Sequence, residues 1–351
     1  MMTAATESRT HTVDGDALQA IDFCYEQGWA ADGLPVVPPE TSRVQAMLMM
    51  EGRPPETIIA HHPATGNECS IQAAAVNAVM AGCIPEYFPV IVAALEAMNE
   101  PAFNFHGSTA STGGSSHIVM VSGPVVEDIG MNSAGNCLGQ GNRANATIGR
   151  AIRLIIMNVF EMIPGVSDQS TQGSPGKYSA CIAERQDVSP WAPMNVELGY
   201  PKEVSSVTMF AGSGFINCEN HGGNTPEAVL GSIADAMANL GSISIGQCAV
   251  ILSPEHIGVI ANAGWSRRNV QEYLFKMACR PVSEMKRVMK YIEKDAEKQN
   301  LPDIHRGLGP DDIFVMVSGG LAGGHSTVIT SWSRSRLSLM QSRPVGVCLD
   351  C

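Results

Sequence analysis

The 351-residue sequence has little charge, few aromatic side chains and no long apolar run. Charged residues make up 16% and aromatic residues 5%, whereas apolar residues make up 44%. The formal net charge of −12 argues against nucleic acid, which requires a basic surface. The absence of a Lys/Arg run argues against a membrane surface. This composition favours a large core and burial of further surface between the subunits of a homo-oligomer.

Targeting and membrane-spanning segments are not visible either. The N-terminal stretch "MMTAATESRTHTVDGD" is polar, so we expect no secretion signal. The longest apolar runs, such as "LIIMNVF", are too short to span a bilayer. The 10 cysteines are spread over the chain, and in a cytoplasmic protein, which we expect here, most would be reduced. Cys348 and Cys351 have the Cys-x-x-Cys spacing of redox pairs, although a plain strand-like terminus is the alternative.

Alternating strand and helix patterns predict an α/β fold with a largely parallel or mixed sheet and helices packed on it. We expect a flexible tail at 1–16, an N-terminal α/β domain at 17–195 and a C-terminal α/β domain at 203–351. The boundary rests on the linker-like composition of residues 190–203. The pentapeptide VMVSG occurs at 119–123 and again at 315–319, which indicates either an internal duplication or a chance match.

Apolar periodicity, capping residues and Gly/Pro breakers place the individual elements. The predicted helices span 17–27, 41–50, 68–81, 86–98, 144–162, 226–239, a segment from 255, 267–278 and 283–298. The predicted strands span 117–123, 204–210, 247–252, 312–320, 326–330 and 344–349.

Three glycine-rich loops follow predicted strands, at 123–144, 211–227 and 318–327. In open α/β sheets, ligands bind beyond the carboxyl ends of strands, so these loops are the candidate sites. In the first loop, Gly139 and Gly141, with Ala144, match part of a dinucleotide fingerprint. The match begins well after the strand, and no acidic residue follows at the usual distance of about 20 residues, which argues against a nicotinamide or flavin cofactor.

The same two glycines would let the backbone approach a small anion. Arg143 begins the next predicted helix, where a cation is unfavourable beside the positive end of the helix dipole. An anionic substrate held by Arg143, Asn142 and free N–H groups would resolve this, with Arg150 and Arg153 adding positive charge along the helix. The alternative is that these arginines pair with acidic residues elsewhere in the fold.

Two of the loops contain a cysteine and two contain a histidine. Cys137, near the helix start, is a candidate nucleophile because nearby positive charge lowers a thiol pKa, and a buried structural cysteine is the alternative. Cys218, Glu219 and His221 fit either a thiolate–imidazole pair or ligands of a divalent metal ion. A loop whose polar residues only cap a helix is the alternative there. His325 fits a general base, or a histidine that only bonds a turn.

Four stretches of the sequence carry a family resemblance. They are "DGLPVVPPE" (32–40), "NAVMAGCIPEYFPV" (77–90), "RANATIGRAIRL" (143–154) and "PGKYSACIAE" (175–184). They resemble a poorly characterised bacterial family of about this length, whose members accompany short thiol or selenol proteins with a Cys/Sec-Gly-Ser-Cys motif. The resemblance implies a small thiol or selenol protein as redox partner. It brings no catalytic residue to this chain, which has no Cys-Gly-Ser-Cys of its own.

Three hypotheses of function follow. The leading one is an enzyme that acts on a small anionic metabolite by thiol chemistry, as a lyase, a hydrolase or a reductive cleavage enzyme. Cys137 or Cys218 would supply the thiol, and His221 or His325 would move protons. The second is a metal-dependent hydro-lyase or hydrolase. The third is a non-catalytic subunit that positions a small thiol or selenol protein.

Overall fold

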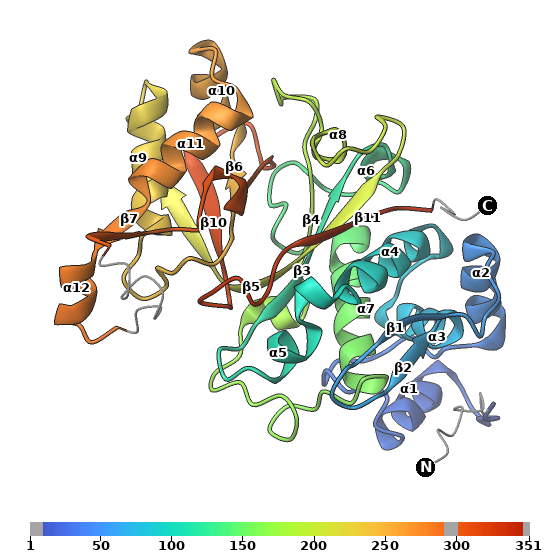
Figure 1. Cartoon of the computed structure of the whole chain (residues 1–351). Helices are drawn as coiled ribbons and strands as arrows, with labels where there is room; N and C mark the ends of the chain where they lie inside the picture. The colour runs from blue at the N-terminus through green and yellow to red at the C-terminus, as the bar shows by residue number, and fades with distance from the viewer. Residues whose placement is uncertain (1–9, 291–300, 347–351) are drawn as a thin grey trace.

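The computed structural model describes residues 10–290 and 301–346 (Figure 1). The Cys348/Cys351 pair, most of the expected tail, and the last parts of the helix predicted at 283–298 and the strand predicted at 344–349 lie outside the described residues. No helix among the described residues has the length and apolar character needed to cross a membrane.

The N-terminal part of the described chain is mostly helical. The Asp16 carboxylate caps α1 by accepting hydrogen bonds from its first turn. The next helix begins at Thr41 itself, after Glu40, which makes no side-chain cap. The helix predicted at 68–81 begins later, at Ile71, because residues 68–70 form a strand and Ser70 caps the helix. The elements are α1 (Ala17–Glu26), α2 (Thr41–Glu51), β1 (Ile58–His61), β2 (Glu68–Ser70), α3 (Ile71–Ala81), α4 (Phe88–Met98) and α5 (Phe105–Ala110).

A seven-stranded mixed sheet forms the centre of the molecule, in the order β4-β3-β5-β10-β6-β9, with β11 also paired to β5. In this sheet β3 runs parallel to β4 and β6 runs parallel to β9, whereas the other pairs are antiparallel. The α/β class is confirmed, and the sheet is mixed. The strands are β3 (Ser116–Ser122), β4 (Cys181–Ala183), β5 (Ser206–Glu219), β6 (Cys248–Leu252), β9 (Ile313–Val317), β10 (His325–Ser331) and β11 (Gln341–Pro344).

Strand β5 is much longer than predicted. The sequence predicts a strand that ends at 210 and a loop at 211–227, but β5 continues to Glu219. The glycines in this stretch suggested a loop, yet one of them, Gly212, allows close packing of the sheet. A Cβ atom at Gly212 would lie 2.7 Å from Ile118 Cδ1 and 2.8 Å from Ile329 Cγ2. Pairing with β10 along its length extends β5, and local sequence does not reveal that partner.

The strand order repeats within the sheet. In each half the first strand lies between the other two: β3 between β4 and β5, and β6 between β9 and β10. In each half the first strand is parallel to the second and antiparallel to the third. This is the arrangement that a duplicated chain would give. The two VMVSG pentapeptides do not mark it, because they occupy β3 and β9, which are not equivalent.

This single sheet also crosses the predicted domain boundary at 190–203. Strands β3 and β4 belong to the predicted N-terminal domain, whereas β5, β6, β9 and β10 belong to the predicted C-terminal one. The repeating unit of three strands therefore ends after β5 and not at 190–203. The division into two domains stays a prediction.

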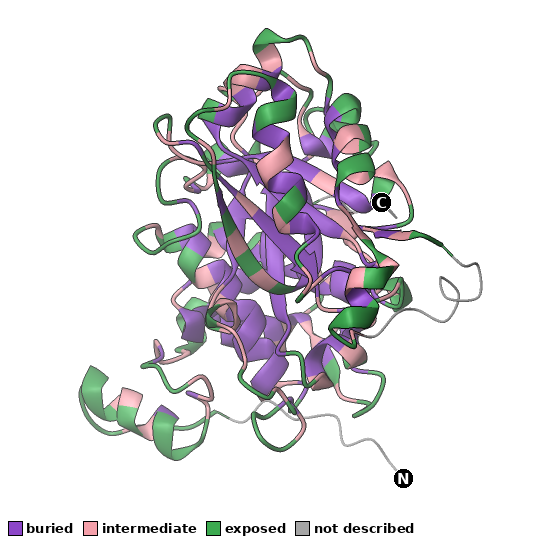
Figure 2. Cartoon of the chain, turned by 90° about the vertical axis from the view of Figure 1, so that its left-hand side faces the viewer, coloured by how far each residue is buried: buried purple, intermediate pink, exposed green. Residues whose placement is uncertain are grey.

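Helices cover the outer face of each half-sheet (Figure 1). The first half packs on α3, α4 and α7 (Arg143–Asn158), and the second on α9 (Pro226–Met237), α10 (Pro254–Asn262) and α11 (Arg267–Met277). Side chains on the opposite face of both halves form one shared apolar cluster, so the curled sheet encloses it; Figure 2 shows the buried sheet. The smaller elements are α6 (Val125–Asp128), α8 (Met194–Glu197), β7 (Cys279–Pro281), α12 (Val282–Arg287) and β8 (Asp303–His305).

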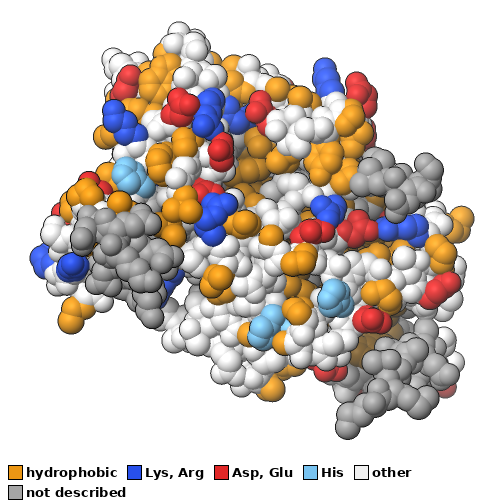
Figure 3. Space-filling model, viewed as in Figure 1, with side chains coloured by type: hydrophobic (Ala, Val, Ile, Leu, Met, Phe, Trp, Pro, Cys, Tyr) orange, Lys and Arg blue, Asp and Glu red, His pale blue; other side chains and the backbone are white. Residues whose placement is uncertain are grey.

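The curl brings the two edge strands of this sheet together at one end. The backbone N–H of Arg185, just after β4, donates to the carbonyl of Val317 at the end of β9. The Ser318 hydroxyl donates to the Ala183 carbonyl at 2.9 Å. On the face in Figure 3, cationic and acidic side chains lie side by side and do not form a continuous field of either sign.

Candidate functional site

The glycine-rich loop that follows β9 connects the other two candidate loops. Gly319 N–H donates to the Ser133 carbonyl at 2.8 Å, and Gly320 lies against Gly135, where a Cβ would come within 3.3 Å of the Gly135 Cα. Further along the same loop, Gly324 N–H donates to His221 Nδ1 at 3.3 Å. The loop after β9 therefore contacts the Cys137 loop through its first residues and the His221 loop through its last ones.

Cys137 lies at the end of the sheet where β4 and β9 meet. It is buried in the shared apolar cluster, and its thiol lies beside the Ser318 hydroxyl. Burial raises the pKa of the Cys137 thiol, and interactions with the Ser318 side chain and with nearby backbone N–H groups offset part of the rise. Of the two alternatives that the sequence left open, the raised pKa and the burial agree with a buried cysteine and not with a thiol of lowered pKa.

The start of α7 agrees with the predicted helix, and its arginines have partners within the chain. Arg143 Nε donates to the Gly82 carbonyl at 3.0 Å, and the Arg143 side chain is exposed. Arg150 pairs with Asp32 at 2.7 Å, which is the structural alternative that the sequence left open. Asn142 caps the helix by accepting from Asn145 N–H. The predicted anion site at this helix start, with Gly139 and Gly141, stays a prediction.

Cys218, Glu219 and His221 do not form a metal site. Neighbouring residues of a strand point to opposite faces, so Cys218 is buried under the helices while Glu219 is exposed. His221 Nε2 lies 3.7 Å from Glu219 Oε1, and its Nδ1 lies 3.9 Å from Glu255 Oε1. The His221 ring also lies near His325, with ring centroids 5.0 Å apart, whereas Cys218 faces the other way. Within residues 10–290 and 301–346, no group of three or more His, Cys, Asp or Glu side chains is placed to hold a metal ion.

Burial raises the Cys218 pKa as well. Its thiol is directed to the Ile216 carbonyl at 3.6 Å, and desolvation raises its pKa to about 11. A nucleophilic thiolate paired with His221 therefore has no support from this geometry. His325 bonds Asn217 through Nδ1 at 3.2 Å and is exposed, so its predicted role as a base stays a prediction.

The sequence reasoning missed a buried carboxyl directly after β4. Glu184 is 1% exposed, and its Oε2 accepts from Met194 N–H at 2.8 Å. Burial raises its pKa from 4.5 to about 7, against the lowering effects of the Met194 N–H and of Arg267. The other oxygen, Oε1, has no hydrogen-bond partner and lies 3.5 Å from Arg267 NH2.

Arg267, the first residue of α11, completes this cluster. It is 5% exposed, pairs with Glu197 at 3.0 Å and lies over the Trp191 ring. Its Nε is buried without a hydrogen-bond partner. The segment that the sequence suggested as a linker, around Trp191 and Met194, therefore covers Glu184 and Arg267. In the sequence, Glu184 could have been found only from its position directly after the short apolar stretch that forms β4.

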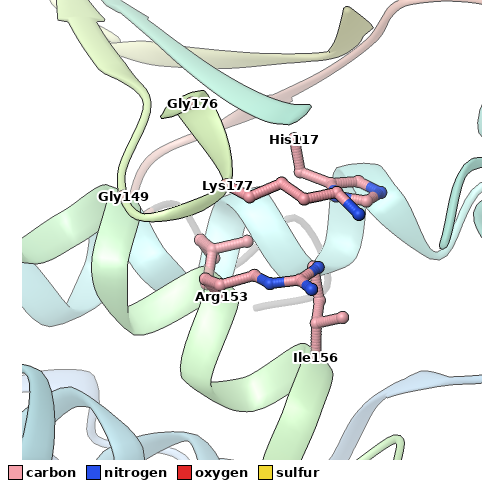
Figure 4. Close-up of a pocket in the computed structure, with 7 residues that line it drawn as sticks. His117, Gly149, Arg153, Ile156, Gly176 and Lys177 are labelled. Atoms are coloured by element: carbon pink, nitrogen blue, oxygen red, sulfur yellow. The ribbon is translucent and has the colours of Figure 1, made fainter. Parts of the chain in front are cut away.

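Arg153, one of the helix arginines that the sequence singled out, lines a small pocket between α7 and the start of β3, together with residues that the sequence reasoning did not place there. Arg153 and Lys177 both pair with the buried Asp168, at 2.8 Å and 2.7 Å, and His117 forms another wall. Figure 4 shows the side-chain nitrogens of His117, Arg153 and Lys177 gathered on one side of this pocket. Charged residues inside an apolar helix were the sequence signal here.

Comparison with protein-family models and with curated protein sequences finds no match to this chain. Its function is therefore inferred from the geometry of these groups.

Proposed function

We propose that the protein is an enzyme that acts on a small anionic substrate where the ends of β4 and β9 meet. We name this place the convergence site and define it by Cys137, Glu184, Arg267 and Ser318. The observation that carries the proposal is the Glu184 carboxyl. Its pKa near 7 suits a general acid or base at neutral pH, and buried perturbed groups of this kind are concentrated at functional sites.

The unpartnered atoms support a ligand at this position. Glu184 Oε1 and Arg267 Nε are both buried and form no hydrogen bond of normal geometry, and Glu184 Oε1 lies 3.5 Å from Arg267 NH2. The Gln186 side-chain amide is also close to the Glu184 carboxyl and lowers its pKa. Buried polar atoms are nearly always hydrogen-bonded, so a donor and an acceptor left open together call for a polar ligand. Arg267 would bind the anionic group of the substrate, and Glu184 would give or take a proton.

Cys137 and Ser318 link this acid to the thiol chemistry that the sequence suggests. Ser318 bonds the Ala183 carbonyl, next to Glu184, and its hydroxyl lies beside the Cys137 thiol. Burial keeps that thiol protonated at neutral pH, so it must lose its proton before it can react. We assign the proton transfer to Glu184 and not to the exposed His221 or His325. Lyase or hydrolase chemistry follows from such a set of groups.

Turnover measured with a panel of small carboxylates and phosphate esters by 1H NMR tests the proposal. We expect E184Q to lose about 100-fold or more in kcat on any substrate found, the usual contribution of a general acid or base. C137S tests the thiol in the same assay. E227Q, at an exposed position in the first turn of α9, is the matched control and should retain activity. Wild-type turnover by E184Q would refute the assignment.

The predictions about partner proteins do not depend on the proposed chemistry. A homo-oligomer, a small thiol or selenol partner and a cytoplasmic location stay predictions. Co-purification of the tagged chain with a small thiol protein, together with no turnover by the chain alone, would favour the non-catalytic hypothesis.

A further inference from the structure

A cationic pocket lies at the opposite end of β3 from the convergence site. Its walls come from the middle of α7, from the start of β3 and from the turn at 175–177 (Figure 4). It is small, with room for about one water-sized group, and it is partly open to solvent. Its lining residues are His117, Gly149, Ile152, Arg153, Ile156, Gly176 and Lys177. The pocket shares no residue with the convergence site.

One carboxylate holds both cations of this pocket. Asp168 Oδ2 accepts from Arg153 NH2 at 2.8 Å and from Lys177 Nζ at 2.7 Å. Its Oδ1 accepts from the Ser170 hydroxyl and backbone N–H. Burial alone would raise the pKa of Asp168, but these hydrogen bonds hold it well below its usual range, so Asp168 carries one full negative charge.

The charges in the pocket do not balance. Two cations face one carboxylate, and His117 adds no charge, because burial lowers its pKa to about 3. The Ser108 hydroxyl donates to the Phe105 carbonyl, so it accepts from His117 Nε2 at 2.9 Å. A net charge of one positive unit therefore remains in a largely buried place. Such a charge is costly unless a counter-charge joins it.

One donor in this pocket is also open. Arg153 is 6% exposed, and its NH1 is buried without a hydrogen-bond partner, while NH2 is engaged by Asp168. A buried guanidinium nitrogen without an acceptor is rare, because buried donors are nearly always satisfied. An acceptor that carries one negative charge would satisfy Arg153 NH1 and balance the pocket at the same time.

We propose that this pocket binds a small monovalent anion, a halide ion or the carboxylate end of a small acid, between Arg153 NH1 and Lys177 Nζ. The bound anion ties the segment around Lys177 to α7. It thereby fixes the N-terminal end of β3, where His117 lies. The site is independent of the proposed activity, because it contains none of the groups of the convergence site.

The probe is sodium chloride, and the measurement is the line width of the 35Cl NMR signal, which broadens when chloride exchanges with a protein site. K177M is the main variant, since Arg153 can still pair with Asp168 and the fold is retained. We expect its chloride affinity to fall at least tenfold, the loss typical of one charge-assisted hydrogen bond. R153Q should show a similar loss.

The control is R53Q, which removes a cation that is paired with Glu51 and Glu96 and that does not line this pocket. It should broaden the chloride signal as the wild type does. Crystals soaked in sodium bromide should show an anomalous peak within hydrogen-bond distance of Arg153 and Lys177. If sodium formate displaces chloride, the site also binds carboxylates. If formate has no effect, the site binds halides. Equal broadening by K177M and wild type, or bromide only elsewhere, overturns the proposal.

Discussion

Replacement of Glu184 by glutamine separates the charge of this carboxyl from its shape. In the folded chain the Glu184 pKa is about 7, compared with an ordinary value of 4.5, because the side chain is 1% exposed. Between these two pH values the folded state holds a proton that the unfolded state has lost. The free energy of unfolding therefore falls as the pH rises from about 4.5 to about 7, and the whole loss amounts to about 3 kcal/mol.

The E184Q variant keeps an oxygen for the Met194 N–H but has no charge to bury. As the pH rises from 4.5 to 8, the free energy of unfolding of the wild type falls relative to that of E184Q. The change in this difference should be about 3 kcal/mol. Urea unfolding at several pH values in this range, followed by tryptophan fluorescence under reducing conditions, measures the difference. E227Q is the control, because Glu227 is an exposed glutamate on α9 and is not among the groups that act on the pKa of Glu184. It should keep the pH dependence of the wild type.

Parallel pH curves for E184Q and wild type would refute the reasoning. They would show that Glu184 is ionised in the folded protein at the same pH as in the unfolded chain. The carboxyl would then be an ordinary member of the ion pair with Arg267, and the acid–base role would lose its physical basis. This result does not depend on knowing the substrate.

Two further predictions concern the thiols and the sheet. Iodoacetamide at pH 7 should alkylate the partly exposed Cys279 before the buried Cys137, as peptide mass spectrometry would show; faster labelling of Cys137 would contradict its raised pKa. G212A should lower the free energy of unfolding by about 1–3 kcal/mol, because its Cβ overlaps two core isoleucines. The control G231A, in open space on α9, should raise it by about 0.5–1 kcal/mol, and equal effects in urea unfolding would argue against the close packing.

Features that depend on neighbouring residues could be predicted from the sequence. The helices that begin after Asp16, Thr225 and Ser253 start close to their predicted bounds, because each of these side chains caps the first turn and a cap is decided within one helical turn. The buried strands β3, β6 and β9 were also found from their short apolar runs. Features that depend on distant partners were missed. The second half of β5 is held by β10, about one hundred residues later in the chain.

The candidate site follows the same rule. The glycine-rich segments were visible in the sequence, although most of the loop predicted at 211–227 is strand β5. The structure brings the loop after β9 into contact with the other two segments. The pKa of a side chain could not be predicted, because it depends on how much water the fold removes. That is why the sequence could not decide between an acidic and a buried Cys137, and why Glu184 was overlooked.

The repeat in the sheet explains why there is one convergence site and not two. Strands β4 and β9 occupy equivalent edge positions, and the curl joins their ends through contacts in both directions: Arg185 N–H to Val317, and the Ser318 hydroxyl to Ala183. The residues that follow the two strands, Glu184 and Ser318, have different chemistry. A single site with an acid from one half and a hydroxyl from the other is the result, so the halves cannot exchange roles. Exchange of these two residues should therefore abolish any activity that E184Q impairs.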